Sequence, residues 1–243
     1  MEDAAENLGM SLRALDDYLT KEVAEFEGLG AVSKFATGQS NPTYLLSAAC
    51  GTYVLRSKPP GKLLPSAHAV DREFRVMKAL SGTPVPVPEV LHLAEEDASP
   101  SGRTFFLMRF VEGRIFWDPA LPDCNNDERA GIYDAMNATL ASLHDVDPGT
   151  VGLSDFGKPG NYFARQLDRW SKQYRASVDA PAPDMQRIMN WLADNLPVDD
   201  GQVSLVHGDW RLDNMIFDPK QPMVAAVLDW ELSTLGHPMA DLA

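Results

Sequence analysis

Three polar side chains near the C-terminal end of the chain stand out by their type and spacing. Asp209 and Asn214 lie five residues apart on a predicted loop that leaves a strand, and Asp229 ends a second predicted strand fifteen residues later. Phosphoryl transfer from ATP needs a carboxylate that orients the acceptor hydroxyl and takes its proton, together with oxygen ligands for Mg²⁺. The spacing therefore predicts a base and two metal ligands around one phosphate.

The sequence around these side chains resembles the kinase-like superfamily of aminoglycoside phosphotransferases and choline kinases. The matching segments are HGDWRLDNMIFD (207–218) and VLDWELSTLGHPMADLA (227–243), and they are most similar to the branch found with acyl-CoA dehydrogenases. This resemblance implies that Asp209 is the catalytic base, Asn214 a metal ligand and Asp229 the main metal ligand. It implies ATP and Mg²⁺ as cofactors, and Asp241 as a brace for the catalytic loop.

For each of these aspartates taken singly, a helix cap or a turn residue is the favoured interpretation. His207 is interpreted as a structural hydrogen-bonding residue, because no second histidine or cysteine lies at the spacing of zinc ligands. The spaced set of Asp209, Asn214 and Asp229 after a β-rich region favours the kinase-type site.

The segment Gly38–Thr43 lies between two predicted strands, where the superfamily places the loop that covers the phosphates. We expect its backbone N–H groups and the side chains of Ser40 and Asn41 to meet phosphate oxygens. The segment has only one glycine, so a plain hairpin turn is the alternative.

Kinases of this type carry a lysine on the third strand, paired with a glutamate on the next helix. The sequence departs from that pattern, since Arg56 takes the lysine position and Glu73 is its expected partner. Arginine can make two parallel bonds to phosphate, so Arg56 can serve this role. The alternatives are Lys58, which shares its strand face, and a surface Arg–Glu pair with no role in binding.

The segment Phe106–Gly113 resembles the hinge of the superfamily. The resemblance implies that backbone groups near Arg109 and Val111 bind adenine. A simple core strand explains the same apolar residues, and the two interpretations are compatible.

Hydrophobic periodicity predicts the remaining elements. Strands are expected at 31–37, 43–50, 52–57, 90–95 and 104–111, with short ones at 205–206, 215–217 and 224–228; helices are expected at 12–26, 70–80, 127–144, 161–177 and 184–196. The predicted fold is α+β and two-lobed, like a protein kinase, with a β-rich N-terminal lobe and a mainly helical C-terminal lobe. The nucleotide-binding lobe is expected at 1–108, the hinge at 109–113 and the catalytic lobe at 114–243. Because the superfamily usually continues with further helices that wall the acceptor pocket, the resemblance implies either a catalytic lobe that is incomplete here or an unusually open pocket.

The amino-acid composition limits the classes of partner that the chain is expected to bind. The 243 residues carry 35 acidic and 21 basic side chains, a net charge of −14, which disfavours nucleic acid and anionic membranes. Two cysteines and an acidic N-terminus favour a cytoplasmic protein with reduced thiols. Oligomeric state stays open.

The sequence thus predicts a small-molecule kinase that phosphorylates a hydroxyl group, with a hydroxy acid or hydroxyacyl thioester as the expected acceptor. One alternative is a nucleotide-binding pseudokinase, which the unusual Arg56 supports and the intact Asp209, Asn214 and Asp229 oppose. The other is an aminoglycoside phosphotransferase, the same chemistry on a cationic substrate that suits the acidic surface.

Overall fold

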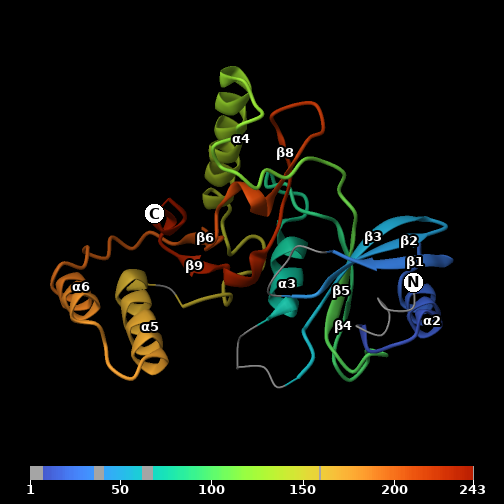
Figure 1. Cartoon of the computed structure of the whole chain (residues 1–243), viewed down its shortest axis with the longest axis horizontal. Coiled ribbons are helices and arrows are strands. Elements are labelled where there is room, and N and C mark those ends of the chain that lie inside the picture. The colour runs from blue at the N-terminus through green and yellow to red at the C-terminus, as the bar shows by residue number, and fades with distance from the viewer. Residues whose placement is uncertain (1–7, 36–40, 62–67, 159, 243) are drawn as a thin grey trace. The chain divides into compact units, whose positions relative to one another are not determined.

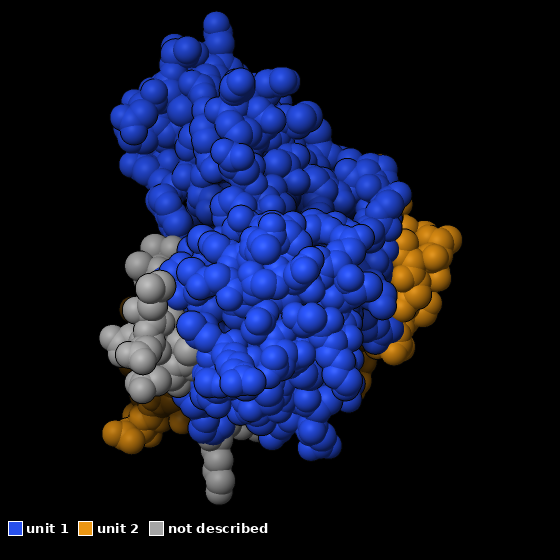
Figure 2. All heavy atoms as spheres, turned by 90° about the vertical axis from the view of Figure 1, so that its right-hand side faces the viewer, with its two compact units in different colours: residues 1–142, 209–232 blue, residues 143–208, 233–243 orange. Residues whose placement is uncertain are grey.

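The computed structural model describes residues 8–35, 41–61, 68–158 and 160–242. The chain divides into two compact units, residues 1–142 with 209–232 and residues 143–208 with 233–243, which Figure 2 colours separately. The predicted lobes at 1–108 and 114–243 stay a prediction, because the compact units reflect contacts within the chain and not nucleotide binding. The two units are described in turn.

The first unit is built on a five-stranded antiparallel sheet with the strand order β1-β2-β3-β5-β4 (Figure 1). Its strands are β1 (Leu29–Lys34), β2 (Thr43–Ala48), β3 (Gly51–Ser57), β4 (Val90–Ala94) and β5 (Phe105–Arg109). Two helices accompany them, α2 (Leu12–Glu22) and α3 (Val70–Leu80). A tight connection before Gly51 joins β2 and β3 into the predicted hairpin, with Ala48 opposite Gly51.

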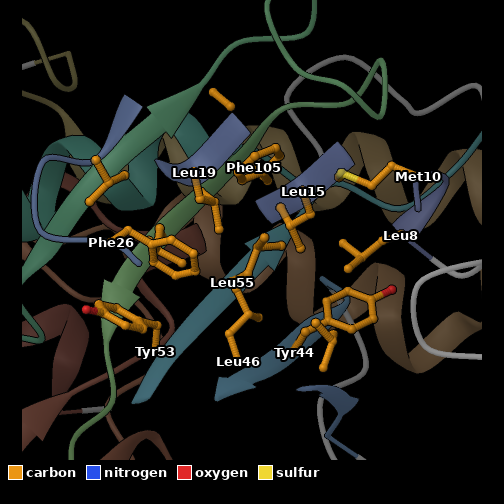
Figure 3. Packing of buried hydrophobic residues seen from close by; sticks show 14 residues of the cluster. Leu8, Met10, Leu15, Leu19, Phe26, Tyr44, Leu46, Tyr53, Leu55 and Phe105 are labelled. Atoms are coloured by element: carbon orange, nitrogen blue, oxygen red, sulfur yellow. The ribbon is translucent and has the colours of Figure 1, made fainter. Parts of the chain in front are cut away.

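Helix α2 packs on one face of this sheet. Leu15 and Leu19 of α2 are almost fully buried among Leu46, Leu55 and Phe105 of the strands (Figure 3). Ser11 caps the helix, since its hydroxyl accepts a bond from the backbone N–H three residues on. Burial of such aliphatic and aromatic side chains contributes about 1.5–3 kcal/mol each, so this layer fixes the sheet.

Helix α3 packs on the other face of the sheet. Side chains alternate along a strand, so the neighbours of buried Leu55 in β3 point away from α2. Arg56 is therefore on the α3 face, directly opposite Phe106 of β5, whose ring contacts Phe74 of α3 at 6.1 Å between centroids. This register places the Arg56 side chain where α3 can meet it.

The rest of the first unit carries a small hairpin near the chain's C-terminal end. Its elements are η1 (Leu212–Asn214), β7 (Met215–Phe217), β8 (Val224–Val227) and η2 (Trp230–Leu232), and α4 (Asn126–His144) precedes them in the chain. Arg114 and Phe217 exchange two backbone hydrogen bonds of 2.8 Å. Gly113 permits this approach, because a Cβ there would lie 2.2 Å from the Phe217 carbonyl oxygen.

The second unit holds two helices and a two-stranded ladder. They are α5 (Tyr162–Ser177), α6 (Pro183–Asp194), β6 (Ser204–Val206), β9 (Thr234–Gly236) and the short η3 (Pro238–Asp241). β6 pairs with β9 in antiparallel register, Leu205 opposite Leu235. In the described part of the chain, no helix is long and apolar enough to cross a membrane.

The predicted α+β class is confirmed, as are the helices and the predicted strands within a few residues, while residues 36–37 of the strand predicted at 31–37 lie outside the described residues. The first helix ends earlier than expected, at Glu22, with Val23 as its C-cap. The strand predicted to include Cys50 ends at Ala48, and Cys50 lies exposed in the turn before β3. Strand β9 and the three short 3₁₀ helices were not predicted, since the helices are too short to show periodicity and β9 lacks the apolar run that indicated β6 and β7.

Candidate active site

A compact group of charged and polar side chains lies in the first unit. We call it the Arg56 cluster, and it consists of Arg56, Glu73, Asp229, Glu231 and Asn41. Arg56 Nε lies 2.9 Å from a carboxylate oxygen of Glu73, and Arg56 Nη2 lies 2.6 Å from Asp229 Oδ1. One guanidinium thus joins the third strand and the following helix to the segment after β8.

The predicted partnership of Arg56 with Glu73 is confirmed. Glu73 lies in the first turn of α3 on its buried side, and only 1% of its side chain is exposed, against 13% for Arg56. Because Glu73 is buried and Arg56 is largely covered, a surface ion pair is excluded as their description. Lys58, the alternative cation, instead pairs with Asp71 at 3.3 Å.

Asp229 is held in an unusual backbone conformation directly after β8. Its φ is +61°, in the left-handed region that aspartate tolerates better than branched residues do. On its two sides, the Leu228 N–H bonds the Asn214 carbonyl oxygen at 2.8 Å, and the fully buried Trp230 donates Nε1–H to the Val227 carbonyl oxygen at 3.1 Å. These bonds fix the turn and aim the carboxylate at Arg56.

Burial controls the ionisation of the Arg56 cluster. Burial raises the pKa of Glu73 to about 7, and although Arg56 opposes the shift, the charges of Asp229 and Glu231 support it. Burial disfavours the charge on Arg56 as well, but Glu73 and Asp229 outweigh it and keep the pKa of Arg56 above its ordinary value. Arg56 is therefore always cationic, while carboxylates outnumber cations in the cluster.

Asp209 and Asn214 are brought together by the loop between them. The amide Nδ2 of Asn214 donates to Asp209 Oδ2 at 2.8 Å and to the Asp209 carbonyl oxygen at 2.9 Å. The turn of η1 makes this possible, since it folds the five-residue segment back on itself. Arg211 and Asp213 of the same loop form their own ion pair, and the Asp213 hydrogen bond raises the pKa of Arg211.

In the second unit, Asp241 binds the backbone of the segment that precedes Asp209 in the chain. Its carboxylate accepts the N–H groups of His207 at 2.9 Å and Gly208 at 2.7 Å, and it lies 3.0 Å from His144 Nε2. The Asp241 side chain is fully buried, as is His207. These bonds hold the backbone at 207–208, and the role of Asp241 as a brace for the catalytic loop stays a prediction.

We expect Asp241→Asn to lower the free energy of unfolding by about 1–3 kcal/mol, because the new amide turns a donor toward backbone N–H groups and leaves a buried donor unsatisfied. Urea denaturation measures the change. Asp168→Asn is the matched control, since Asp168 forms only an exposed pair with Lys172 and should cost less than about 1 kcal/mol. Equal stability of the two variants would show that Asp241 is not a structural brace.

The residues expected to hold the nucleotide are only partly visible in the described chain. Ser40 lies outside the described residues. Asn41 is described and is 1% exposed, with its amide bonded to Glu73, Glu231 and His68. Contact of Ser40 and Asn41 with phosphate stays a prediction.

The expected hinge begins at the end of β5. The Arg109 N–H bonds the Glu89 carbonyl oxygen at 2.9 Å, and the Arg109 side chain pairs with the carboxylates of Glu89 and Glu25. Val111 follows two residues later, beyond the strand. Adenine binding near Arg109 and Val111 stays a prediction, with the Arg109 N–H already engaged within the protein.

Sequence reasoning missed Glu231. Its carboxylate accepts a hydrogen bond from Asn41 Nδ2 at 3.3 Å, and one of its oxygens lies within 4.8 Å of oxygens of Glu73 and Asp229. The available signal was its position two residues after Asp229 on a segment that leaves a strand. Without the fold, an ordinary exposed glutamate was the simpler interpretation.

The donor set of this region fits a magnesium ion. Glu73, Asp229 and Glu231 each offer a carboxylate oxygen within 4.8 Å of the others, and Mg²⁺ prefers carboxylate oxygens combined with substrate phosphates. Asn214 uses its amide nitrogen on Asp209, so its carbonyl oxygen is the atom suited to a metal. The excess of negative charge over the single Arg56 favours a bound divalent cation.

The antiparallel sheet, the helical region and these contacts define a phosphotransferase of kinase-like fold. The sequence profile of the phosphotransferase enzyme family (APH) matches residues 31–243, and the chain belongs to this family. The predicted resemblance is thereby confirmed.

Two curated relatives confirm the predicted branch. The chain is 52% identical over 210 residues to acyl-CoA dehydrogenase family member 10 of Mus musculus, covering 86% of this chain and 20% of that protein. It is 46% identical over 236 residues to family member 11 of Rattus norvegicus, covering 96% of this chain and 30% of that protein. The chain therefore spans less than a third of the length of these relatives.

Solved structures share the fold. A Ralstonia eutropha protein with a provisional aminoglycoside phosphotransferase name is 48% identical, with a TM-score of 0.84 over 96% of this chain and 68% of that one. An aminoglycoside phosphotransferase in a ternary complex with streptomycin and ATP is 18% identical, with a TM-score of 0.65 over 96% of this chain and 74% of that one. The second likeness shows the kinase-like fold alone, and with the first it confirms the predicted fold.

Proposed function

We propose that the chain is an ATP- and Mg²⁺-dependent kinase that phosphorylates a hydroxyl group of a small molecule. The observation that carries the proposal is the Asp209 carboxylate, held by Asn214 in a loop that is tied through the Leu228 N–H to the turn of Asp229. A carboxylate fixed in this way suits a base that accepts a proton from an alcohol. Family membership and the Arg56 cluster support the same chemistry.

In the proposed reaction, the acceptor oxygen forms a bond to the γ-phosphorus of ATP while the bond from that phosphorus to the β–γ bridging oxygen breaks. ADP is the leaving group, and the hydroxyl proton passes to Asp209. Asn214 orients the Asp209 carboxylate, and its amide N–H keeps one carboxylate oxygen engaged. Arg56, permanently charged and fork-shaped, is suited to bind phosphate oxygens.

Asn214 and Asp229 would hold the magnesium ion, and Glu231 offers a carboxylate oxygen within 4.8 Å of one from Asp229. The ion supplies neutralisation of phosphate charge when it is bound. Ser40 remains a proposed phosphate contact, and the backbone near Arg109 and Val111 remains the proposed adenine site.

The proposed acceptor is a hydroxy acid or its acyl thioester. Support comes from the names of the relatives, which place chains like this one within acyl-CoA dehydrogenase family members. Phosphorylation would convert a hydroxyl into a leaving group that later acyl chemistry can expel. An aminoglycoside is the second candidate, favoured by the net charge of −14 and by the name of the Ralstonia eutropha structure.

An ATP-consumption assay over hydroxy acids, their thioesters, choline and aminoglycosides tests the proposal, with Asp209→Asn as the control for contaminating kinases. We expect Mg²⁺-dependent turnover of a hydroxy acid or thioester by the wild type only. Turnover of an aminoglycoside alone would reject the acceptor and retain the kinase. Tight Mg–ATP binding without turnover of any alcohol would instead support a nucleotide-binding module, an alternative that the Arg56–Asp229 ion pair favours.

A further inference from the structure

Asn41 is a buried polar side chain that links distant parts of the first unit. Only 1% of the residue is exposed. Its Nδ2 donates to Glu73 Oε1 at 3.0 Å and to Glu231 Oε2 at 3.3 Å, and its Oδ1 lies 3.1 Å from His68 Nδ1. Both ends of the amide are thus used inside the protein, which leaves the side chain poorly placed to reach a phosphate.

The chemistry of these neighbours fixes the orientation of the amide. Glu73 Oε1 also accepts the Nε–H of Arg56, so this oxygen is an acceptor, and the NH₂ group of Asn41 faces it and Glu231. The amide oxygen must then face His68, and it requires an N–H there. His68 Nδ1 therefore carries the proton, and the imidazole locks the amide in the orientation that serves both carboxylates.

The Asn41 amide offsets repulsion between carboxylates in the Arg56 cluster. Arg56 bonds Glu73 and Asp229, but Glu231 lies close to both carboxylates and repels them. A neutral donor with two N–H bonds holds Glu73 and Glu231 together without adding charge. Asn41 thereby determines where the Glu231 carboxylate lies relative to Asp229.

We propose that Asn41 is a positioning residue that holds Glu231 beside the metal site at Asp229, and that its side chain makes no contact with the nucleotide. The proposal rests on the proposed function, because it assumes a metal at Asp229. It replaces phosphate contact as the role of Asn41. The two roles differ in what they predict, since a phosphate contact acts with or without metal and a positioning role acts only through it.

The test measures binding, using Mn²⁺ as the probe metal and a fluorescent ATP analogue. Asn41→Leu is expected to weaken Mn²⁺ binding to the protein–nucleotide complex roughly ten- to a hundredfold, the usual effect of losing a hydrogen bond to a charged group. Nucleotide affinity in EDTA should stay within about twofold of the wild type. Asn137→Leu on the exposed surface of α4 is the matched control and should change neither quantity.

A double-mutant cycle separates positioning from general disruption. Glu231→Gln should weaken Mn²⁺ binding by itself, and Asn41→Leu should then add less than about twofold, because the carboxylate that it positions has gone. Asn41→Ser, smaller and still polar, repeats the comparison if the leucine variant melts at a much lower temperature.

Three results would overturn the proposal. They are a loss of nucleotide affinity in EDTA by the Asn41 variants, unchanged Mn²⁺ binding in both of them, or fully additive effects in the cycle. Wild-type protein that binds Mn²⁺ and nucleotide but turns over no alcohol would reject the proposed function alone. Wild-type protein that binds neither would reject both.

Discussion

Replacing Asp209 by asparagine is expected to lower turnover by about 10²–10⁴-fold while leaving Mg–ATP affinity nearly unchanged. Asparagine keeps the size of the side chain, and its carbonyl oxygen can still accept the hydrogen bond from Asn214. What it loses is the ability to take the proton of the acceptor hydroxyl. Steady-state kinetics with the best acceptor, combined with nucleotide binding by calorimetry, measures the two quantities separately.

Asp213→Asn is the matched control in the same loop. Asp213 pairs with Arg211, whose side chain is 58% exposed, so this substitution should change turnover by less than about tenfold. If Asp209→Asn turned over like the wild type, Asp209 would not be the base. If it lost Mg–ATP binding instead, Asp209 would belong to the nucleotide or metal site.

The sequence predicted the parts of the site that are local in the chain. Asp209 and Asn214 are five residues apart, and one loop with a 3₁₀ turn brings them together. Arg56 and Glu73 come from a strand and the next helix, and the resemblance to the kinase-like superfamily predicted their pairing. Periodicity supplied the strand and the helix that carry them, and the resemblance supplied the partners.

The contacts that sequence reasoning missed are long-range. Asn41 and Glu231 are 190 residues apart, and nothing in the chain around Asn41 indicates that its amide is buried between two carboxylates. Polar residues in a loop are normally exposed, which is why phosphate contact was the natural prediction. The burial of Asn41 depends on α3 and the segment after β8 meeting at one place, and only the tertiary fold decides that.

Arg56 is expected to serve stability and nucleotide binding at once. It is the cation that bonds both Glu73 and Asp229, and it is 13% exposed. Removing one partner of a buried ion pair leaves the other charge without compensation and typically costs about 3–5 kcal/mol. Arg56→Ala should therefore lower the free energy of unfolding by about that amount, measured by urea denaturation in the absence of nucleotide.

The same substitution should weaken ATP binding by about 1.5–3 kcal/mol, the range for a hydrogen bond to a charged group. Arg56→Lys should keep part of both properties, because its ammonium is cationic but cannot bond two carboxylates through a rigid fork.

Adding Glu73→Gln to Arg56→Ala separates the role in stability from the role in ATP binding, since it removes the uncompensated buried charge without restoring a phosphate ligand. The double variant should recover stability and remain weak in ATP binding. Recovery of both stability and ATP binding in the double variant would show that Arg56 acts on the nucleotide only through the fold. Unchanged ATP affinity in stably folded Arg56→Ala would exclude Arg56 as a phosphate ligand.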